Sequence, residues 1–192
     1  EKIDIVSGPE GHEIQLIGKC EKGIEAANTI VEHCTWYTQK VINWLNSLKE
    51  PAGYKFSHNS LITMLSNCFV ILTQEGLGNL QDNETLRGKW ISYIQERQDP
   101  ETGLFIDPLL DIYPPADKGH DREYLLYQIT YFAIQALDAL GSHPLYPLIF
   151  LKPFYQQFAV KEWLNHLDWS NPWLESNRVM FVLAFLIYQA EI

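Results

Sequence analysis

The chain has 192 residues, of which 46% are hydrophobic and 13% are aromatic, so it carries enough apolar material for one well-packed domain. Its formal net charge is -10 at pH 7. A surface that follows nucleic-acid phosphates needs clustered Lys and Arg, and the chain holds only 14 of these residues. The composition therefore argues against a disordered chain, and no nucleic acid is expected among its partners.

No segment is predicted to span a membrane. The longest apolar stretch, Val179 to Tyr188, is much shorter than the roughly 20 residues that a membrane-spanning helix needs. Cys20, Cys34 and Cys68 are an odd number and form no Cys-x-x-Cys pair, and no His stands at metal-ligand spacing. We therefore expect reduced thiols, no metal site and a cytoplasmic protein. The sequence does not indicate a particular cofactor.

The first half of the chain predicts a lead-in and a pair of helices. Residues 1–20 are polar and contain several Gly and Pro, so we expect an irregular lead-in and a single domain over residues 21–192. From Gly23 to Leu48 the apolar residues recur at steps of three and four, which predicts a long amphipathic helix. The next segment, Ser60 to Leu72, is apolar on nearly every face, which is typical of a helix that is buried all round.

The same alternation occurs twice more. Thr85 to Gln98 is amphipathic and Asp121 to Leu140 is apolar on most faces. A third pair has a first member interrupted by Pro147 and Pro153, and its second member, Arg178 to Gln189, is the most apolar of all. Alternating helices of these two kinds predict an all-α fold of two layers, built from three helix hairpins.

Such an alternation fits an α/α toroid, in which outer and inner helices alternate around a ring, or an open helical solenoid. A ring of six hairpins needs on the order of 300 residues. Three hairpins therefore predict an α/α-toroid-like half ring, an open array or a part of a longer polypeptide.

A motif recurs ahead of the apolar helices: a bulky aromatic residue and an aliphatic one, then a short loop and another aromatic. The three pairs are Trp44-Leu45, Tyr93-Ile94 and Trp163-Leu164. The second pair is followed by Gln98 and then by Gly103-Leu104-Phe105, and this copy resembles the Gln-Trp repeat of terpenoid cyclases. Those enzymes share their α/α toroid with the protein prenyltransferases. The resemblance implies a central cavity that binds or converts an isoprenoid or lipid-like ligand.

Other functions stay open beside this leading hypothesis, and so does the question of whether the chain is an enzyme. The chain lacks the Asp-x-Asp-Asp cluster and the Asp-Asp-x-x-Asp magnesium motif that the resemblance would bring. The same ring also carries glycosidases and polysaccharide lyases, so a carbohydrate-active toroid is the second hypothesis. A non-catalytic helical interaction domain is the third. A dry aromatic cavity would favour the first, a wet cleft with paired carboxylates the second, and a filled centre the third.

Candidate site residues gather where the loops lead into the apolar helices. Helix N-termini expose unpaired N–H groups and a partial positive charge, which suits anionic ligands. His120 beside Asp121 is a candidate general base oriented by a carboxylate, and Glu175 with Asp121 is a candidate pair for glycoside cleavage. The candidate ligand-binding residues at the same end are His58, Asn59, Tyr124, Asn171 and Asn177.

Each of these candidates also has a structural explanation. Asn and Asp are residue types that cap helices, which accounts for Asp121 and Asn171 without a ligand. Glu175 is an acid in the first turn of a helix, where the helix dipole favours it. Aromatic residues at helical spacing, such as Tyr124, are typical of a core. His120 is equally consistent with a surface loop.

The last apolar helix leads to a prediction about assembly. Val179 to Tyr188 is apolar on all faces, and the sequence ends at Ile192. Large exposed apolar surfaces mark interfaces between chains or domains. We therefore expect a homo-oligomer, or a cover for this helix from another chain or from further polypeptide.

Overall fold

The computed structural model describes residues 4–7, 14–17, 21–80, 84–110 and 121–191. The described chain is mostly helical, which confirms the all-α expectation. In chain order the helices are α1 Glu21–Ser47, α2 Met64–Gly76, α3 Glu84–Gln95, α4 Arg122–Ala139, the 3-10 helix η2 Ile149–Tyr155, α5 Ala159–His166 and α6 Pro172–Glu191.

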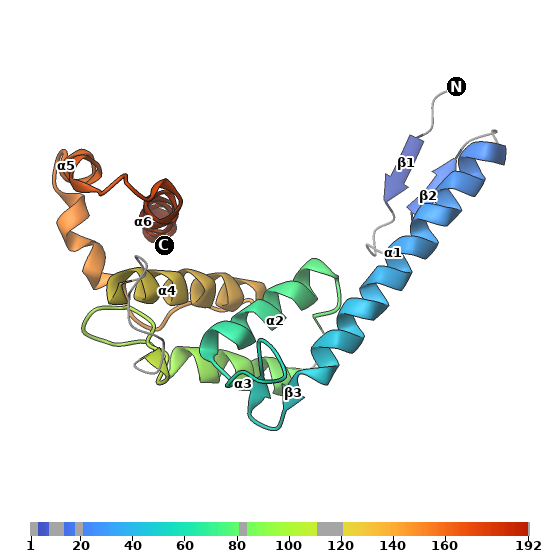
Figure 1. Ribbon diagram of the computed structural model, residues 1–192, viewed down its shortest axis with the longest axis horizontal. Coiled ribbons are helices and arrows are strands. Elements are labelled where there is room, and N and C mark those ends of the chain that lie inside the picture. The colour runs from blue at the N-terminus through green and yellow to red at the C-terminus, as the bar shows by residue number, and fades with distance from the viewer. Residues whose placement is uncertain (1–3, 8–13, 18–20, 81–83, 111–120, 192) are drawn as a thin grey trace.

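The N-terminal segment holds a short β-hairpin, so the expectation of an irregular lead-in is wrong there. Strand β1, Asp4–Ser7, pairs antiparallel with β2, Ile14–Ile17, and the pair lies beside the N-terminal half of α1 (Figure 1). Apolar β-branched residues such as Ile5 and Ile14 suit a pleated strand, and four residues on each side are enough for one antiparallel ladder. A second pair, β3 Lys49–Glu50 and β4 Gly53–Tyr54, makes the turn after α1.

The helices predicted to be buried all round form a stack. Helix α2 packs on α4, and α4 packs on α6. Helix α3 also contacts α4 and lies on the same side of it as α2 (Figure 1). Helix α1 projects away from this stack and is attached to it at its C-terminal end (Figure 1). Completely or almost completely buried side chains of the stack include Met64, Cys68, Ile71, Ile94, Phe105, Ala133, Leu137, Val182 and Phe185.

Helix α2 begins four residues later than its apolar pattern suggests, because a capping box fixes its start. The hydroxyl of Thr63 accepts a hydrogen bond from the backbone N–H of Ser66 at 2.9 Å. In return the Ser66 hydroxyl accepts one from the Thr63 N–H at 3.0 Å. This reciprocal pair satisfies two N–H groups that a helix start otherwise leaves unpaired. The capping therefore decides the boundary, and Ser60 lies in the preceding turn.

The Gln-Trp-like motif fastens the loop after α3 to the segment before η2. The Gln98 side chain is buried, and its Nε2 donates to the carbonyl oxygens of Gly103 at 3.0 Å and of Tyr146 at 2.7 Å. Its Oε1 accepts from the backbone N–H of Tyr146 at 2.9 Å. Phe105, the aromatic residue of the motif, is fully buried, and its N–H donates to Thr130 Oγ1 at 3.0 Å. The motif thus joins three segments that are distant in sequence.

The third helix pair departs most from its prediction. The segment with the two prolines becomes η2, with Pro153 inside it, followed by the short helix α5. Helix α6 begins at Pro172 rather than at Arg178, because proline is well suited to the first position of a helix. The Asn171 side chain supplies the cap, since its Oδ1 accepts from the Leu174 N–H at 3.3 Å.

Two cysteines differ in their surroundings and are expected to differ in reactivity. Cys34 is exposed on α1, whereas Cys68 is buried on α2. Burial, and then the charge of Asp107, raise the pKa of Cys68 to about 12. In a variant that keeps Cys68 alone (Cys20→Ser, Cys34→Ser), labelling by a thiol reagent at pH 8 should be at least about 100-fold slower than in a variant that keeps Cys34 alone. Equal labelling rates would contradict the placement of α2.

Candidate functional site

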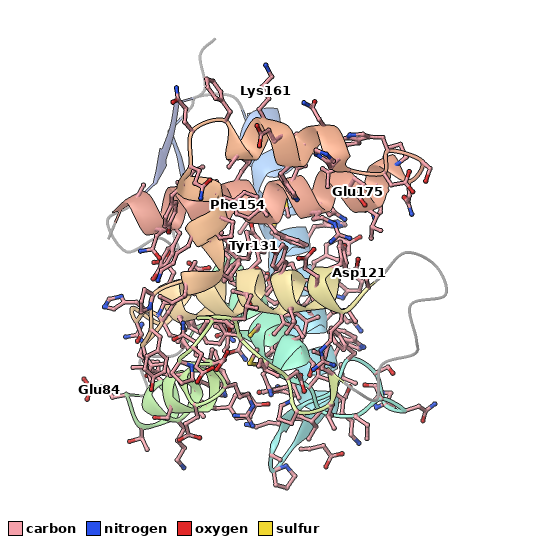
Figure 2. The ribbon with its side chains drawn as sticks, turned by 90° about the vertical axis from the view of Figure 1, so that its left-hand side faces the viewer. Glu84, Asp121, Tyr131, Phe154, Lys161 and Glu175 are labelled. Atoms are coloured by element: carbon pink, nitrogen blue, oxygen red, sulfur yellow. The ribbon has the colours of Figure 1, made fainter. Side chains whose placement is uncertain are left out.

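Arg178, in the second turn of α6, connects the acidic residues at two helix N-termini. Its Nη2 lies 3.1 Å from Asp121 Oδ2, and its Nη1 lies 2.8 Å from Glu123 Oε2. Its Nε lies 3.3 Å from Glu175 Oε2, a charge contact without hydrogen-bond alignment. Figure 2 shows Asp121 and Glu175 at the same end of α4 and α6. We call these four residues the Arg178 cluster.

The cluster has a buried floor and an exposed rim. The side chains of Arg178 and Glu175 are each 8% exposed. Those of Asp121 and Glu123 are 55% and 59% exposed, so they close the cluster toward solvent. A buried ion that loses its partner costs far more than an exposed one. Loss of Arg178 or Glu175 alone would therefore cost more stability than loss of Asp121 or Glu123.

Neither Arg178 nor Tyr127, which adjoins the cluster, can exchange a proton near neutral pH. Burial alone lowers the pKa of Arg178, but the hydrogen bond to Asp121 and the neighbouring carboxylates outweigh it, so the pKa is raised. Burial, and then the charge of Glu123, raise the pKa of Tyr127. The Tyr127 hydroxyl donates to Glu123 Oε1 at 3.4 Å. The arginine thus stays charged and the phenol stays protonated.

The geometry of the cluster is that of an ion-pair network that holds α4 to α6. Asp121 Oδ1 caps α4 by accepting from the Tyr124 N–H at 2.7 Å, and its Oδ2 contacts Arg178. A glycosidic bond would have to lie between the two carboxylates that cleave it. Here the guanidinium of Arg178 contacts both Asp121 and Glu175. Their role as a catalytic pair stays a prediction, and His120 lies outside the described residues.

The predicted ligand-binding residues are divided between this cluster and other places. Tyr124 is buried next to the cluster, and its hydroxyl accepts from Asn177 Nδ2 at 3.3 Å. Asn171 is exposed and caps α6. His58 and Asn59 lie in an exposed turn before α2, and α4 lies between α2 and α6. The structure therefore brings together Asp121, Glu175, Tyr124 and Asn177.

Arg178 itself is the residue that sequence reasoning missed. One signal in the sequence could have found it. Arg178 is a lone cation at the start of the most apolar stretch of the chain, and it follows Glu175 by three residues, which places both on one face of a helix. A buried arginine on such a helix needs an acidic partner, and the nearest carboxylate in sequence, Glu175, was already a candidate site residue.

Aromatic side chains of α4, α6 and η2 pack against each other. The ring of Tyr127 lies 5.4 Å from Phe150 and 6.0 Å from Phe185, between centroids. The ring of Tyr131 lies 5.4 Å from that of Phe181, in the space between α4 and α6 (Figure 2). Such tilted and edge-to-face pairs stabilise a core. The rings thus occupy the space between these helices and η2.

Comparisons with known protein families, with characterised proteins and with solved structures found no match. Among the described residues, no helix has the length and apolar character needed to cross a membrane. In the same part of the chain, no three His, Cys, Asp or Glu side chains gather as they would to hold a metal ion. The described fold is an all-α stack of α2, α4 and α6, with the Arg178 cluster at one end of α4 and α6.

Proposed function

We propose that this chain is a helical interaction domain that binds another helical surface through α6. One observation carries the proposal: the side of α6 that faces away from α4 bears a row of large apolar side chains at steps of seven, three and four residues. They are exposed to solvent, from 42% at Met180 to 76% at Trp173. This row, the α6 stripe, consists of Trp173, Met180, Leu183 and Ile187.

The α6 stripe has the character of an interface. The spacing keeps all four side chains on one face of the helix, as in the seam between packed helices. Helix α4 is covered by α2 on one side and by α6 on the other, whereas the main contacts of α6 within the described chain are with α4 and η2. Contiguous exposed apolar patches mark sites of association. A further helix would therefore continue the stack at this face.

The occupant that fits best is a second copy of the chain. The chain exposes 12921 Å² of surface. A compact monomer of its mass, 22.3 kDa, would expose roughly 9,400 Å². If each copy lost about a third of this excess, the interface would reach the roughly 2,000 Å² at which obligate homodimers begin. Three exposed aromatic side chains of α1 add a second apolar face to each copy: Trp36, Tyr37 and Trp44.

Leu183→Glu is expected to weaken self-association at least about 100-fold, which corresponds to about 2.7 kcal/mol. The reason is that the new carboxylate would be buried in an apolar seam without a partner. Sedimentation equilibrium over a range of concentrations measures the effect. The matched control is Asn165→Glu, which adds the same charge at an exposed position of α5. A wild-type protein that stays monomeric up to about 100 μM, where the free energy of association would be weaker than about -5.5 kcal/mol, would overturn the proposal.

A second part of the proposal concerns the arrangement of the alternating helices. We infer that the stack of α2, α4 and α6, which alternate in sequence with α1, α3 and α5, belongs to a toroid-like array of hairpins. The alternation of helix types and the Gln-Trp-like motif support this inference. The packed aromatic rings argue against an isoprenoid-binding cavity between α4 and α6. Conversion of an isoprenoid or of a carbohydrate therefore stays a prediction.

A further inference from the structure

A cleft lies where the C-terminal end of α1, the β3–β4 turn and α2 meet α3. It consists of two neighbouring hollows of about 130 Å³ and 200 Å³. Both hollows are lined by Lys49, Tyr54, Leu86 and Trp90, so they adjoin each other. We call this space the α1–α3 cleft. No residue of the Arg178 cluster lines it.

Three cations line the α1–α3 cleft, although the chain as a whole is acidic. They are Lys49, Arg87 and Lys89. Glu50 also lines it, but its carboxylate is bound to the Lys55 ammonium at 2.9 Å. In the described part of the chain, none of the three cations has a carboxylate within ion-pair distance. An anion in the cleft would therefore meet uncompensated positive charge.

One donor in the wall of the cleft lacks an acceptor. The Nε–H of Arg87 is buried and has no hydrogen-bond partner within the described residues. A buried donor that stays unpaired costs about 1–3 kcal/mol, so such groups usually have a partner in the functional state. A carboxylate or a phosphate supplies acceptors that match a guanidinium. The unpaired Arg87 donor and the three cations therefore both favour an anionic ligand with a carboxylate or a phosphate group.

The rest of the lining suits a ring that carries hydroxyl groups. Trp90 is half-buried and provides aromatic surface against which a flat ring face can pack, and Tyr54 and Tyr93 line the cleft beside it. Burial raises the pKa of Tyr93, so its phenol keeps its proton. Side-chain amides both donate and accept hydrogen bonds, as hydroxyl groups do. The amide side chains of the lining that could do so are Asn46, Gln74 and Asn79, whereas Asn67 is buried and already bonds to the backbone of Tyr54 and Thr63.

We propose that the α1–α3 cleft binds a small acidic sugar, a hydroxylated ring with one carboxylate or phosphate group. The anionic group would lie beside Lys49, which lines both hollows, and would meet Arg87 in the first hollow or Lys89 in the second. The ring would lie on Trp90. Together the two hollows reach only the lower end of the roughly 300–1,000 Å³ of small-molecule pockets, so the cleft suits a single sugar ring rather than a long oligosaccharide. This site is separate from the α6 stripe and does not depend on self-association.

Isothermal titration calorimetry at low salt tests the proposal with glucuronate and glucose 6-phosphate as probes. Glucose and inorganic phosphate serve as probes of the ring and of the anion alone. At least one acidic sugar should bind more than about 10-fold tighter than glucose, which corresponds to about 1.4 kcal/mol. The double variant Lys49→Gln/Lys89→Gln should lose about 10-fold or more of that affinity, because it removes two of the three charges.

The matched control is Lys152→Gln/Lys161→Gln, which changes the net charge equally at exposed positions of η2 and α5. Lys161 is labelled in Figure 2. Tighter binding of glucuronate assigns the site to carboxylates, and tighter binding of glucose 6-phosphate assigns it to phosphates. Inorganic phosphate that binds as tightly as glucose 6-phosphate would overturn the recognition of a ring. Dissociation constants above about 10 mM for all probes, or equal losses in both double variants, would overturn the site.

Discussion

Gly103→Ala is expected to lower the free energy of unfolding by about 4 kcal/mol or more, an effect at the upper end of those measured for single substitutions. Gly103 has a φ of +80°, a conformation that side chains with a Cβ rarely adopt. A Cβ at this position would lie 2.2 Å from the Pro147 carbonyl oxygen and 2.8 Å from Leu148 Cα. Both obstacles are backbone atoms, so no side-chain rotation removes them.

The surrounding contacts prevent the backbone from moving aside. Gln98 holds Tyr146 through its N–H and its carbonyl oxygen, and Leu148 is buried. The Phe150 N–H donates to the Thr102 carbonyl oxygen at 2.9 Å, which fixes the other end of the segment. Relief of the clash would therefore break several buried hydrogen bonds at about 1–3 kcal/mol each.

Gly88→Ala provides the matched control. Gly88 lies inside α3, is exposed, and a Cβ there would meet no atom within 4 Å. Alanine favours a helix over glycine by up to about 1 kcal/mol, so this variant should be slightly more stable than the wild type. Urea unfolding followed by circular dichroism compares the two substitutions. Equal shifts of the unfolding midpoint would show that Gly103 is not held as described.

Arg178→Met is the second substitution with a large expected effect, a loss of about 3–5 kcal/mol of unfolding free energy. Methionine fills much of the volume of the arginine stem but leaves the buried carboxylate of Glu175 without its cation. The exposed carboxylates of Asp121 and Glu123 lose little, because solvent still reaches them. Guanidinium chloride unfolding at constant pH measures the change.

A double-mutant cycle distinguishes a structural pair from simple loss of packing. Arg178→Met/Glu175→Met removes both charges, so it should recover most of the stability that Arg178→Met loses. Lys161→Met, at an exposed position of α5, controls for the change from cation to methionine and should stay within about 0.5 kcal/mol of the wild type. A double variant as unstable as the single one would mean that the two charges are not coupled.

Much of the helical fold was predictable because local signals and burial agree. Helix α4 was predicted to within one residue at each end, since Asp121 is a strong cap and the apolar pattern begins directly after it. The start of α2 was missed by four residues because the capping box of Thr63 and Ser66, rather than hydrophobicity, sets it. The strands of the lead-in were missed because four residues carry too little periodicity.

The candidate site was predictable in part. The N-termini of two apolar helices that stack side by side bring Asp121, Glu175 and Asn177 to one end, as the alternation of helix types implied. The position of Arg178 between them depends on how α4 and α6 pack, which no single segment specifies. The α1–α3 cleft gave no sequence signal, because its lining comes from several elements that are far apart in the chain. The catalytic and binding roles predicted for Asp121, Glu175 and Asn177 stay predictions.

Helix α1 stands clear of the stack and is anchored by Leu45 and Leu48 near its C-terminal end. Its 27 residues give it a length of about 40 Å. It can therefore work as a lever, since a small rotation at the anchored end becomes a displacement of several ångströms at the other. The α1–α3 cleft lies at the pivot of this lever. Closure of the cleft around a ligand would then change where the far end of α1 carries the β1–β2 pair (Figure 1).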